Sequence, residues 1–306
     1  MRARLSKHSL AAIALGGLVL AGCAGRSPQA GDPVALDPAP DPAYPAALDE
    51  LALESGGSRM NGIVYVAAGA GPHPTVVLLH GYPGNERNLD LAQALRRDGW
   101  DVVFFHYRGA WGSRGEFSFE NARADVAGVL SEVRSPEFVA EHRADPQHVA
   151  LVGHSMGGFL ALMTASEDPA VRCAASLAGA NLGSLGRALA ADPAQAPAAE
   201  QQIDAWSGPI HGFDGALAAK SAVAHADTWD LVQRAPLLAE KHLLLVAGTR
   251  DTNTPIDVHH RPLVAALHAA GASHVDEQIF ASDHAFSDAR IALTRALVAW
   301  LDAECR

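Results

Sequence analysis

The chain has 306 residues and a formal net charge of −11, because 34 acidic residues outnumber 23 basic ones. Proteins that bind nucleic acids need a clustered basic surface, so this balance argues against that class. Hydrophobic residues make up 49% of the chain and charged residues 19%, a composition that favours a large core and excludes a mainly disordered chain. No apolar run reaches the roughly 18 to 20 residues that a membrane-spanning helix requires.

Residues 1–22 have the pattern of a secretory signal peptide. Arg2, Arg4 and Lys7 provide a basic start, and an apolar run follows at residues 10–22. This run ends in Leu-Ala-Gly-Cys at residues 20–23, which resembles the lipobox of bacterial lipoproteins. In that family the signal is removed just before the cysteine, and the cysteine sulfur carries a diacylglycerol group. The alternative is an ordinary signal peptide followed by an unrelated cysteine.

The lipobox resemblance implies export to the bacterial cell envelope and attachment to a membrane through a lipid anchor at Cys23, with the folded domain outside the cytoplasm. Residues 23–47 are rich in Pro, Ala, Asp and Gly without apolar periodicity, so we expect a flexible tether. We expect the other two cysteines to be unpaired thiols. Cys173 lies in an apolar, strand-like run, and Cys305 is next to the last residue.

From residue 48 to the C-terminus, short apolar runs alternate with helical patterns, which is typical of a sheet covered by crossover helices. The first two runs flank a Ser-Gly-Gly-Ser turn and predict an antiparallel pair, whereas the later runs predict buried parallel strands. The expected strands are 51–53, 63–66, 75–79, 102–105, 149–152, 171–177, 243–247 and 275–280. The expected helices are 88–97, 121–133, 157–166, 258–270 and 285–301. We therefore predict an α/β domain with a doubly wound, mostly parallel sheet.

One segment interrupts this alternation. Residues from 182 to about 236 separate two strands, a length far above the usual two to six residues of an α/β connection. The segment contains alanine-rich helical stretches, and we expect a helical lid insertion over the C-terminal edge of the sheet. The alternative is an alanine-rich surface excursion with a small core of its own.

The most informative motif is Gly-His-Ser-Met-Gly at residues 153–157, directly after a predicted strand and before a predicted helix. In this setting Gly-x-Ser-x-Gly indicates a nucleophile elbow, which exposes the serine hydroxyl above the sheet. Bulky residues two positions before or after the serine would collide with the neighbouring strand and helix. Ser155 is therefore the candidate nucleophile, against the alternative of a small-residue turn that only permits tight packing.

A serine hydroxyl needs a base to accept its proton and an acid to orient that base. For this type of site the chain order is nucleophile, acid, histidine. Asp251 follows the predicted strand 243–247 and is the candidate acid. Its rival Asp257 stands where the next helix begins, a position that suits capping or the helix dipole.

The candidate base is His284, which follows the last predicted strand in the required order. The chain has fifteen histidines, so position is the criterion that selects it. His274 precedes its strand and belongs to the wrong edge of the sheet, whereas His259 and His260 lie within a helical pattern.

A glycine-containing loop at residues 80–85 follows the predicted strand 75–79 and is the expected source of oxyanion-hole donors. We assign the backbone N–H groups of Tyr82 and Met156 to this role. His80 is expected to pack or hydrogen-bond beneath the loop and to transfer no proton. The sequence has no His-x-Glu or Cys-x-x-Cys spacing and predicts no metal site.

With these motifs in the same order, the chain from residue 48 onward resembles the α/β-hydrolase superfamily. The run at residues 106–117, His-Tyr-Arg-Gly-Ala-Trp-Gly-Ser-Arg-Gly-Glu-Phe, is similar to a loop of serine hydrolases related to the prolyl oligopeptidase and dienelactone hydrolase branches. The chain lacks the upstream β-propeller of the former and the nucleophilic cysteine of the latter. The resemblance therefore implies the superfamily and its fold, with the branch only suggested.

We expect a serine hydrolase that cleaves a small carboxylic ester or related acyl compound through an acyl-serine intermediate, without a cofactor. The alternatives are an exported serine peptidase or amidase with the same triad, an acyltransferase, and a non-catalytic binding protein on the same scaffold. The residues predicted to line an acyl pocket are Trp111, Phe117, Phe119, Trp206 and Phe213, although aromatic residues are more often part of a core.

Overall fold

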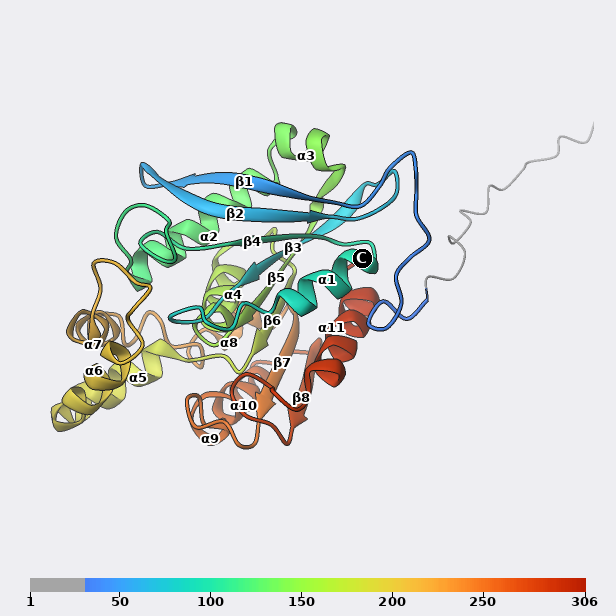
Figure 1. The fold of residues 1–306 in the computed structure, drawn as a ribbon. Helices are drawn as coiled ribbons and strands as arrows, with labels where there is room; N and C mark the ends of the chain where they lie inside the picture. Colours follow the sequence, from blue (N-terminus) through green and yellow to red (C-terminus); the bar gives the residue numbers. More distant parts are fainter. Residues whose placement is uncertain (1–30) are drawn as a thin grey trace, which may run out of the picture. The chain divides into compact units, whose positions relative to one another are not determined.

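The computed structural model describes residues 31–306, in which eight strands form a single sheet (Figure 1). The sheet order is β1-β2-β4-β3-β5-β6-β7-β8. β1, β2 and β4 pair antiparallel, and every pairing from β4 to β8 is parallel. The strands are β1 (Ala47–Ser55), β2 (Ser58–Val66), β3 (His73–Leu79), β4 (Asp101–Phe105), β5 (Ala144–His154), β6 (Cys173–Leu177), β7 (His242–Gly248) and β8 (Val275–Phe280). The doubly wound, mostly parallel sheet and its leading antiparallel pair are as predicted.

Helices cover both faces of the sheet, which therefore has two hydrophobic clusters. Alternate residues of β3 divide between them: Val77 and Leu79 belong to one cluster, Val76 and Leu78 to the other. The first cluster includes residues of α2, α4 and α10, and the second includes residues of α1 and α11. Strands buried on both faces explain the continuous apolar runs in the sequence. The helices outside the insertion are α1 (Leu89–Arg97), α2 (Phe119–Val133), α3 (Pro136–His142), α4 (Met156–Glu167), α9 (Ile256–His259), α10 (Arg261–Ala269) and α11 (Arg290–Glu304).

Three helices differ from the sequence-based expectation. The predicted helix 258–270 is two helices, α9 and α10, divided at His260, two residues before Pro262. A proline removes a backbone donor and disfavours helical geometry in the residue before it, so helices tend to divide there. α11 begins at Arg290 instead of residue 285. The short α3, for which no helix was predicted, begins at Pro136 with the Ser135 side chain as its N-cap.

The insertion between β6 and β7 is helical, as expected. Figure 1 shows α5, α6 and α7 close together at one side of the sheet, and Leu182 of α5 and Ala218 of α7 belong to the first hydrophobic cluster. Its helices are α5 (Leu182–Ala191), the short 3₁₀ helix η1 (Pro193–Gln195), α6 (Ala196–Asp204), α7 (Gly215–Ala224) and α8 (Ala235–Leu238). α6 has no buried residue, and it packs mainly on α7 and on the adjacent η1.

The expectation of two unpaired thiols is wrong, because Cys173 and Cys305 form a disulfide with a Cα–Cα distance of 6.0 Å. This separation lies within the usual range for a disulfide. Although Cys305 is next to the last residue, it directly follows α11, which packs on the sheet. This packing places Cys305 at the start of β6. Neither position in the sequence revealed this proximity.

The predicted signal peptide and the lipidation residue Cys23 lie outside the described residues. Within residues 31–306 no helix has the length and hydropathy needed to cross a bilayer.

Candidate active site

Ser155 occupies the turn between β5 and α4 with φ 57° and ψ −118°, a backbone conformation that non-glycine residues rarely adopt. The flanking glycines make this turn possible. A Cβ atom on Gly153 would lie 2.0 Å from the Gly157 carbonyl oxygen, and one on Gly157 would lie 2.1 Å from the Leu79 carbonyl oxygen. Both contacts are with backbone that cannot move aside. The spacing Gly-x-Ser-x-Gly is therefore a packing requirement of this strand–helix junction.

Asp251 and His284 meet after the ends of β7 and β8. The Nδ1–H group of His284 donates to Oδ2 of Asp251 at 2.7 Å, and the Asp251 side chain is almost fully buried. Burial alone raises the pKa of Asp251, but the hydrogen bonds from His284 and Thr254 outweigh it and hold that pKa well below its usual range. Asp251 is thus a carboxylate that fixes the tautomer of His284 and leaves Nε2 as the proton acceptor.

Ser155 and His284 line the same cavity, which has a volume of about 380 Å³. No hydrogen bond joins the two side chains among the interactions of residues 31–306. In enzymes of known mechanism, catalytic hydrogen bonds are often long before substrate binds and tighten in the complex. The predicted constellation of Ser155, Asp251 and His284 therefore converges at one edge of the sheet, with the Asp251–His284 contact already formed.

The loop after β3 brings backbone donors to the serine. A Cβ atom on Gly81 would lie 2.9 Å from the Ser155 Cβ atom, so only glycine permits this approach. Tyr82 and Met156 both line the cavity, and neither backbone N–H donates to any of the residues described here. Met156 opens α4, where the first-turn N–H groups have no partner within the helix. Two backbone donors without a partner among the described residues thus belong to residues that line the same cavity as Ser155.

His80 supports this loop from below. Its Nδ1–H donates to the Gly81 carbonyl oxygen at 2.7 Å, and the Tyr107 hydroxyl donates to the His80 carbonyl oxygen at 3.0 Å. Burial lowers the pKa of His80 to about 3, so the ring is neutral near pH 7. Its position agrees with the expectation that it hydrogen-bonds beneath the loop.

The aromatic residues predicted to line the pocket divide into two groups. Trp206 and Phe119 line the cavity. Phe117 and Phe213 do not: they are buried in the core, where their ring centroids are 5.1 Å apart. Trp111 also lies outside the lining, and its Nε1–H donates to the Pro83 carbonyl oxygen at 2.7 Å. The prediction for these three residues is corrected: Trp111 braces the loop that carries Tyr82, and the two phenylalanines pack the insertion against the sheet.

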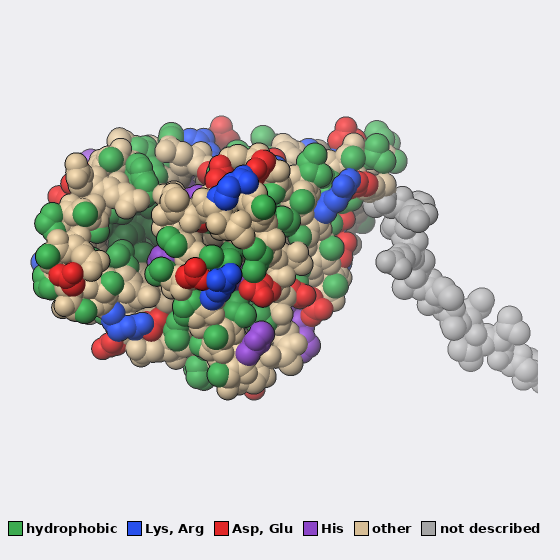
Figure 2. Space-filling model, turned by 90° about the horizontal axis from the view of Figure 1, so that it is seen from below, with side chains coloured by type: hydrophobic (Ala, Val, Ile, Leu, Met, Phe, Trp, Pro, Cys, Tyr) green, Lys and Arg blue, Asp and Glu red, His purple; other side chains and the backbone are tan. Residues whose placement is uncertain are grey.

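The cavity lies between the sheet edge and the insertion. Leu182, Leu185 and Ile203, from α5 and α6, form part of its lining together with Trp206. Figure 2 shows a hollow lined by hydrophobic side chains on the side of the molecule occupied by these helices. The cavity therefore combines an apolar wall from the insertion with the polar region around Ser155.

Two residues of the site were not predicted from the sequence, Thr254 and His259. The Thr254 hydroxyl donates to Oδ2 of Asp251 at 2.7 Å and also lies 3.0 Å from the Ala178 carbonyl oxygen. His259 lines the cavity, and its Nδ1 accepts the backbone N–H of Asn181 at 3.0 Å. Burial lowers the pKa of His259 to about 4, so this ring is neutral and carries its proton on Nε2. The spacing Asp251-x-x-Thr254, a local side-chain-to-backbone turn, was the available signal for the first residue.

The histidine that precedes the nucleophile is a third such residue. The Nε2–H of His154 donates to the His284 carbonyl oxygen at 2.8 Å, and the two ring centroids are 4.7 Å apart. Burial lowers the pKa of His154 to about 3. A neutral His154 therefore holds the backbone of the candidate base.

The rival candidates are located elsewhere. Asp257 lies in the first turn of α9 and pairs with Arg261. His260 pairs with Glu277 at 2.7 Å, and His274 lies before β8, at the opposite edge of the sheet from His284. These positions agree with the reasons for setting them aside.

Comparison with known proteins identifies the fold family of the chain. Residues 74–277 match the family model described as alpha/beta hydrolase fold. An uncharacterised protein of Mycobacterium tuberculosis is 28% identical over 133 residues, which are 43% of this chain and 46% of that protein. An uncharacterised 31.7 kDa protein of Escherichia coli is 31% identical over 110 residues, covering 34% of this chain and 36% of that protein. The matched segment thus spans less than half the length of these curated relatives.

Among solved structures, an esterase of Pyrococcus furiosus matches with a TM-score of 0.62 and 16% identity, over 86% of this chain and 93% of the esterase. An acylaminoacyl peptidase of Pyrococcus horikoshii matches with a TM-score of 0.61 and 16% identity, over 84% of this chain and 42% of the peptidase. At these identities the likeness concerns the fold alone, so the chemistry must be argued from the site.

Proposed function

Because the chain belongs to the alpha/beta hydrolase fold family, we propose that it is a serine hydrolase that cleaves small carboxylic esters through an acyl-serine intermediate. One observation carries the proposal. Ser155, in the rare backbone conformation of the β5–α4 turn, shares a cavity with His284, whose Nδ1 is bound to the buried Asp251 at 2.7 Å. This combination supplies a nucleophile, a base and a group that orients the base.

In the proposed reaction the Ser155 hydroxyl attacks the ester carbonyl carbon while Nε2 of His284 accepts its proton. The tetrahedral intermediate collapses, the carbon–oxygen bond to the alcohol breaks, and His284 returns the proton to the departing alcohol. Water then attacks the acyl-serine, with His284 again as base, and releases the carboxylic acid. Asp251 remains ionised throughout and stabilises the imidazolium, in keeping with its lowered pKa.

The backbone N–H groups of Tyr82 and Met156 are proposed to stabilise the oxygen of the tetrahedral intermediate. Their lack of partners among the described residues supports this role, because such donors are most effective when they are already oriented before the reaction. Loss of one oxyanion-hole donor typically costs about 10²- to 10³-fold in kcat.

Labelling with a fluorophosphonate probe tests the nucleophile. We expect the intact protein to be labelled and Ser155→Ala to be unlabelled. Ser184→Ala, a variant of a serine on α5 that does not line the cavity, is the matched control and should be labelled like the intact protein. Failure of the intact protein to react would favour a non-catalytic binding protein on this scaffold.

The same preparation separates ester from amide hydrolysis. Turnover of p-nitrophenyl esters of graded acyl length, without turnover of aminoacyl p-nitroanilides, is the expected result. Cleavage of the anilides with loss in Ser155→Ala would replace the esterase proposal with that of an exported peptidase.

We further propose that Cys23 carries a lipid anchor, as the sequence around it suggests. Growth of an expressing bacterium with labelled palmitate should label the chain, and Cys23→Ala should remove the label and release the protein from the membrane fraction. An unlabelled but exported chain would support the ordinary signal peptide instead.

A further inference from the structure

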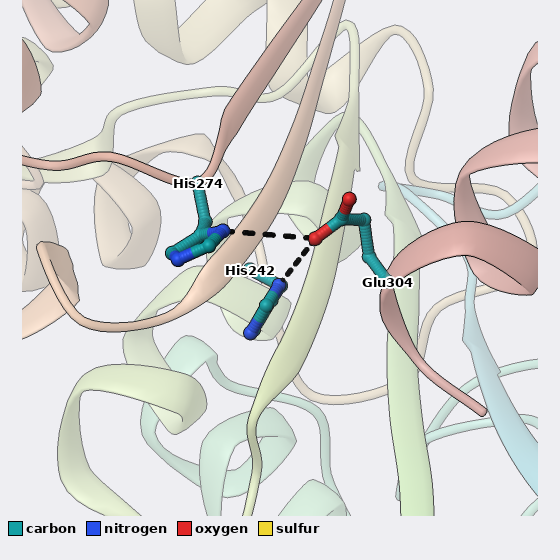
Figure 3. A group of neighbouring side chains, drawn as sticks. All are labelled: His242, His274 and Glu304. Atoms are coloured by element: carbon teal, nitrogen blue, oxygen red, sulfur yellow. Dashed lines mark hydrogen bonds and ion pairs between the residues drawn. The ribbon is translucent and has the colours of Figure 1, made fainter.

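Three side chains that can bind metals meet at the edge of the sheet opposite the candidate active site. His242 is the first residue of β7, His274 immediately precedes β8, and Glu304 is the last residue of α11. Figure 3 shows both imidazole rings beside the Glu304 carboxylate, with one nitrogen of each directed at the same oxygen. Within residues 31–306 this is the one group of three such side chains whose ligand atoms lie close enough to share an ion.

From this arrangement we infer that His242, His274 and Glu304 form a binding site for a divalent transition-metal ion of the zinc type. Two imidazoles and one carboxylate suit zinc and its neighbours in the periodic table, whereas magnesium and calcium prefer sites made of oxygen ligands alone. Three protein ligands leave the fourth tetrahedral position to water.

The distances are compatible with such an ion. The three ligand atoms all lie within 4.8 Å of one another. Nδ1 of His242 is 2.6 Å from Oε2 of Glu304, and Nδ1 of His274 is 3.7 Å from the same oxygen. Around a tetrahedral zinc ion with bonds of about 2.0 to 2.1 Å, neighbouring ligand atoms are about 3.4 Å apart. To reach this spacing, the His242–Glu304 distance must lengthen by less than an ångström and the His274–Glu304 distance must shorten slightly. Small side-chain rotations can provide both changes.

The site is accessible to an ion and its water. The side chains of His274, Glu304 and His242 are 50%, 31% and 18% exposed, so solvent reaches all three side chains. The two imidazole rings are 4.3 Å apart between centroids, at an angle of 35°. Binding therefore needs no opening of the fold.

The backbone holds the three ligands in place. The Leu243 N–H donates to the His274 carbonyl oxygen at 2.8 Å, which fixes the two histidine-bearing segments side by side. Cys173 is the register partner of His242 across β6 and β7, and Cys305 follows Glu304 in the chain. The Cys173–Cys305 disulfide therefore ties the glutamate to the strand beside the histidine. Because these segments are already ordered, ion binding loses little conformational entropy here.

An ion at this position would act on stability and not on the reaction. It lies at the amino ends of β7 and β8, whereas Asp251 and His284 follow the carboxyl ends of the same strands. A ligand that binds only the folded state raises the free energy of unfolding by mass action. The expected effect is stabilisation of the junction between α11 and the sheet.

Calorimetric titration with ZnCl₂ tests the inference, using protein without a polyhistidine tag that has been treated with EDTA and dialysed. We expect one zinc ion per chain, a higher Tm with zinc, and no Tm change with MgCl₂. His274→Ala should weaken zinc binding at least tenfold, and Glu304→Gln should also weaken it. His268→Ala, which removes an exposed histidine of α10, should bind zinc like the intact protein.

Two results would overturn the inference: no zinc binding at millimolar concentration, or equal binding by His274→Ala and the intact protein. His274 is exposed, so its variant should fold, and the circular dichroism spectrum verifies this. Ser155→Ala should bind zinc normally, which keeps this test independent of the proposed hydrolytic function.

Discussion

Thr254 donates its hydroxyl proton to Asp251 at 2.7 Å, and it does so at Oδ2, the carboxylate oxygen that also accepts the Nδ1–H of His284. Asp251 uses its other oxygen to accept the backbone N–H groups of Asn253 and Thr254 at 2.8 and 3.0 Å. The orientation of the candidate base therefore depends on Thr254, which acts on His284 through the carboxylate of Asp251. Thr254 is a positioning residue.

Replacing Thr254 with valine keeps the shape of the side chain and removes the hydroxyl donor. Because hydrogen bonds to charged groups are worth about 1.5 to 3 kcal/mol, we expect kcat for a p-nitrophenyl ester to fall about tenfold or more while KM changes little. Thr254→Ser should recover most of kcat. A serine variant as slow as the valine variant would show that packing, and not the hydroxyl group, matters at this position.

The two fully buried histidines His80 and His154 make stability depend on pH. Burial lowers the pKa of each ring to about 3, whereas an unfolded histidine titrates near pH 6.5. Between these values the unfolded chain binds protons that the folded chain does not, so the free energy of unfolding should fall as the pH drops below about 6.5. The slope contributed by each ring is about 1.4 kcal/mol per pH unit.

Urea denaturation at pH 7, 6 and 5 measures this dependence. His80→Gln should show a smaller loss of stability per pH unit than the intact protein, whereas a variant of the exposed His268 to glutamine should not. A His80→Gln variant that loses as much stability per pH unit as the intact protein would contradict the assignment of a neutral, buried His80 ring.

Gly157→Ala tests the packing of the nucleophile turn. The new Cβ atom would meet the Leu79 carbonyl oxygen at 2.1 Å, a clash with backbone, so we expect the free energy of unfolding to fall by about 3 kcal/mol or more. Gly208→Ala is the matched control, since no atom lies within 4 Å of its Cβ position. Thermal denaturation of both variants checks the prediction, which fails if their Tm values are equal.

Trp206→Ala should change the preference for acyl length. Trp206 lines the cavity with Ile203 and is partly exposed there, so its removal takes apolar surface from one wall. We expect kcat/KM for an octanoate ester to fall about tenfold or more, with a smaller change for acetate. Val223→Ala, an exposed position of α7 outside the cavity, should leave both values unchanged. Equal losses for both esters in Trp206→Ala would show that this wall does not bind the acyl chain.

The sheet was predictable because each strand carries its own signal. A run such as Val76–Leu79 is apolar on both faces, which only a covered strand requires. The first residue of α11 was harder to predict, because the sequence of residues 285–289 is equally compatible with a helix. In the structure these residues form a turn next to His284, which contacts Asp251. Helix propensity cannot predict such a turn, because it depends on contacts between residues that are distant in the sequence.

Within the candidate site, Ser155 was identifiable because its motif is contiguous and has a steric cause. Phe117 and Phe213 were misassigned because an aromatic residue near a strand end has the same sequence signal whether it faces a pocket or the core. His242, His274 and Glu304 are separated by 30 residues or more, so no spacing rule could associate them. Their proximity follows from strand order and from the docking of α11.

The disulfide closes residues 173–305 into a covalent ring that contains the insertion, Asp251 and His284, while Ser155 lies before it. A protease that cuts an exposed peptide bond of α6 would therefore leave the two pieces joined through Cys173 and Cys305. For a protein proposed to work outside the cytoplasm, where disulfides persist, a single cut would not separate the candidate nucleophile from Asp251 and His284.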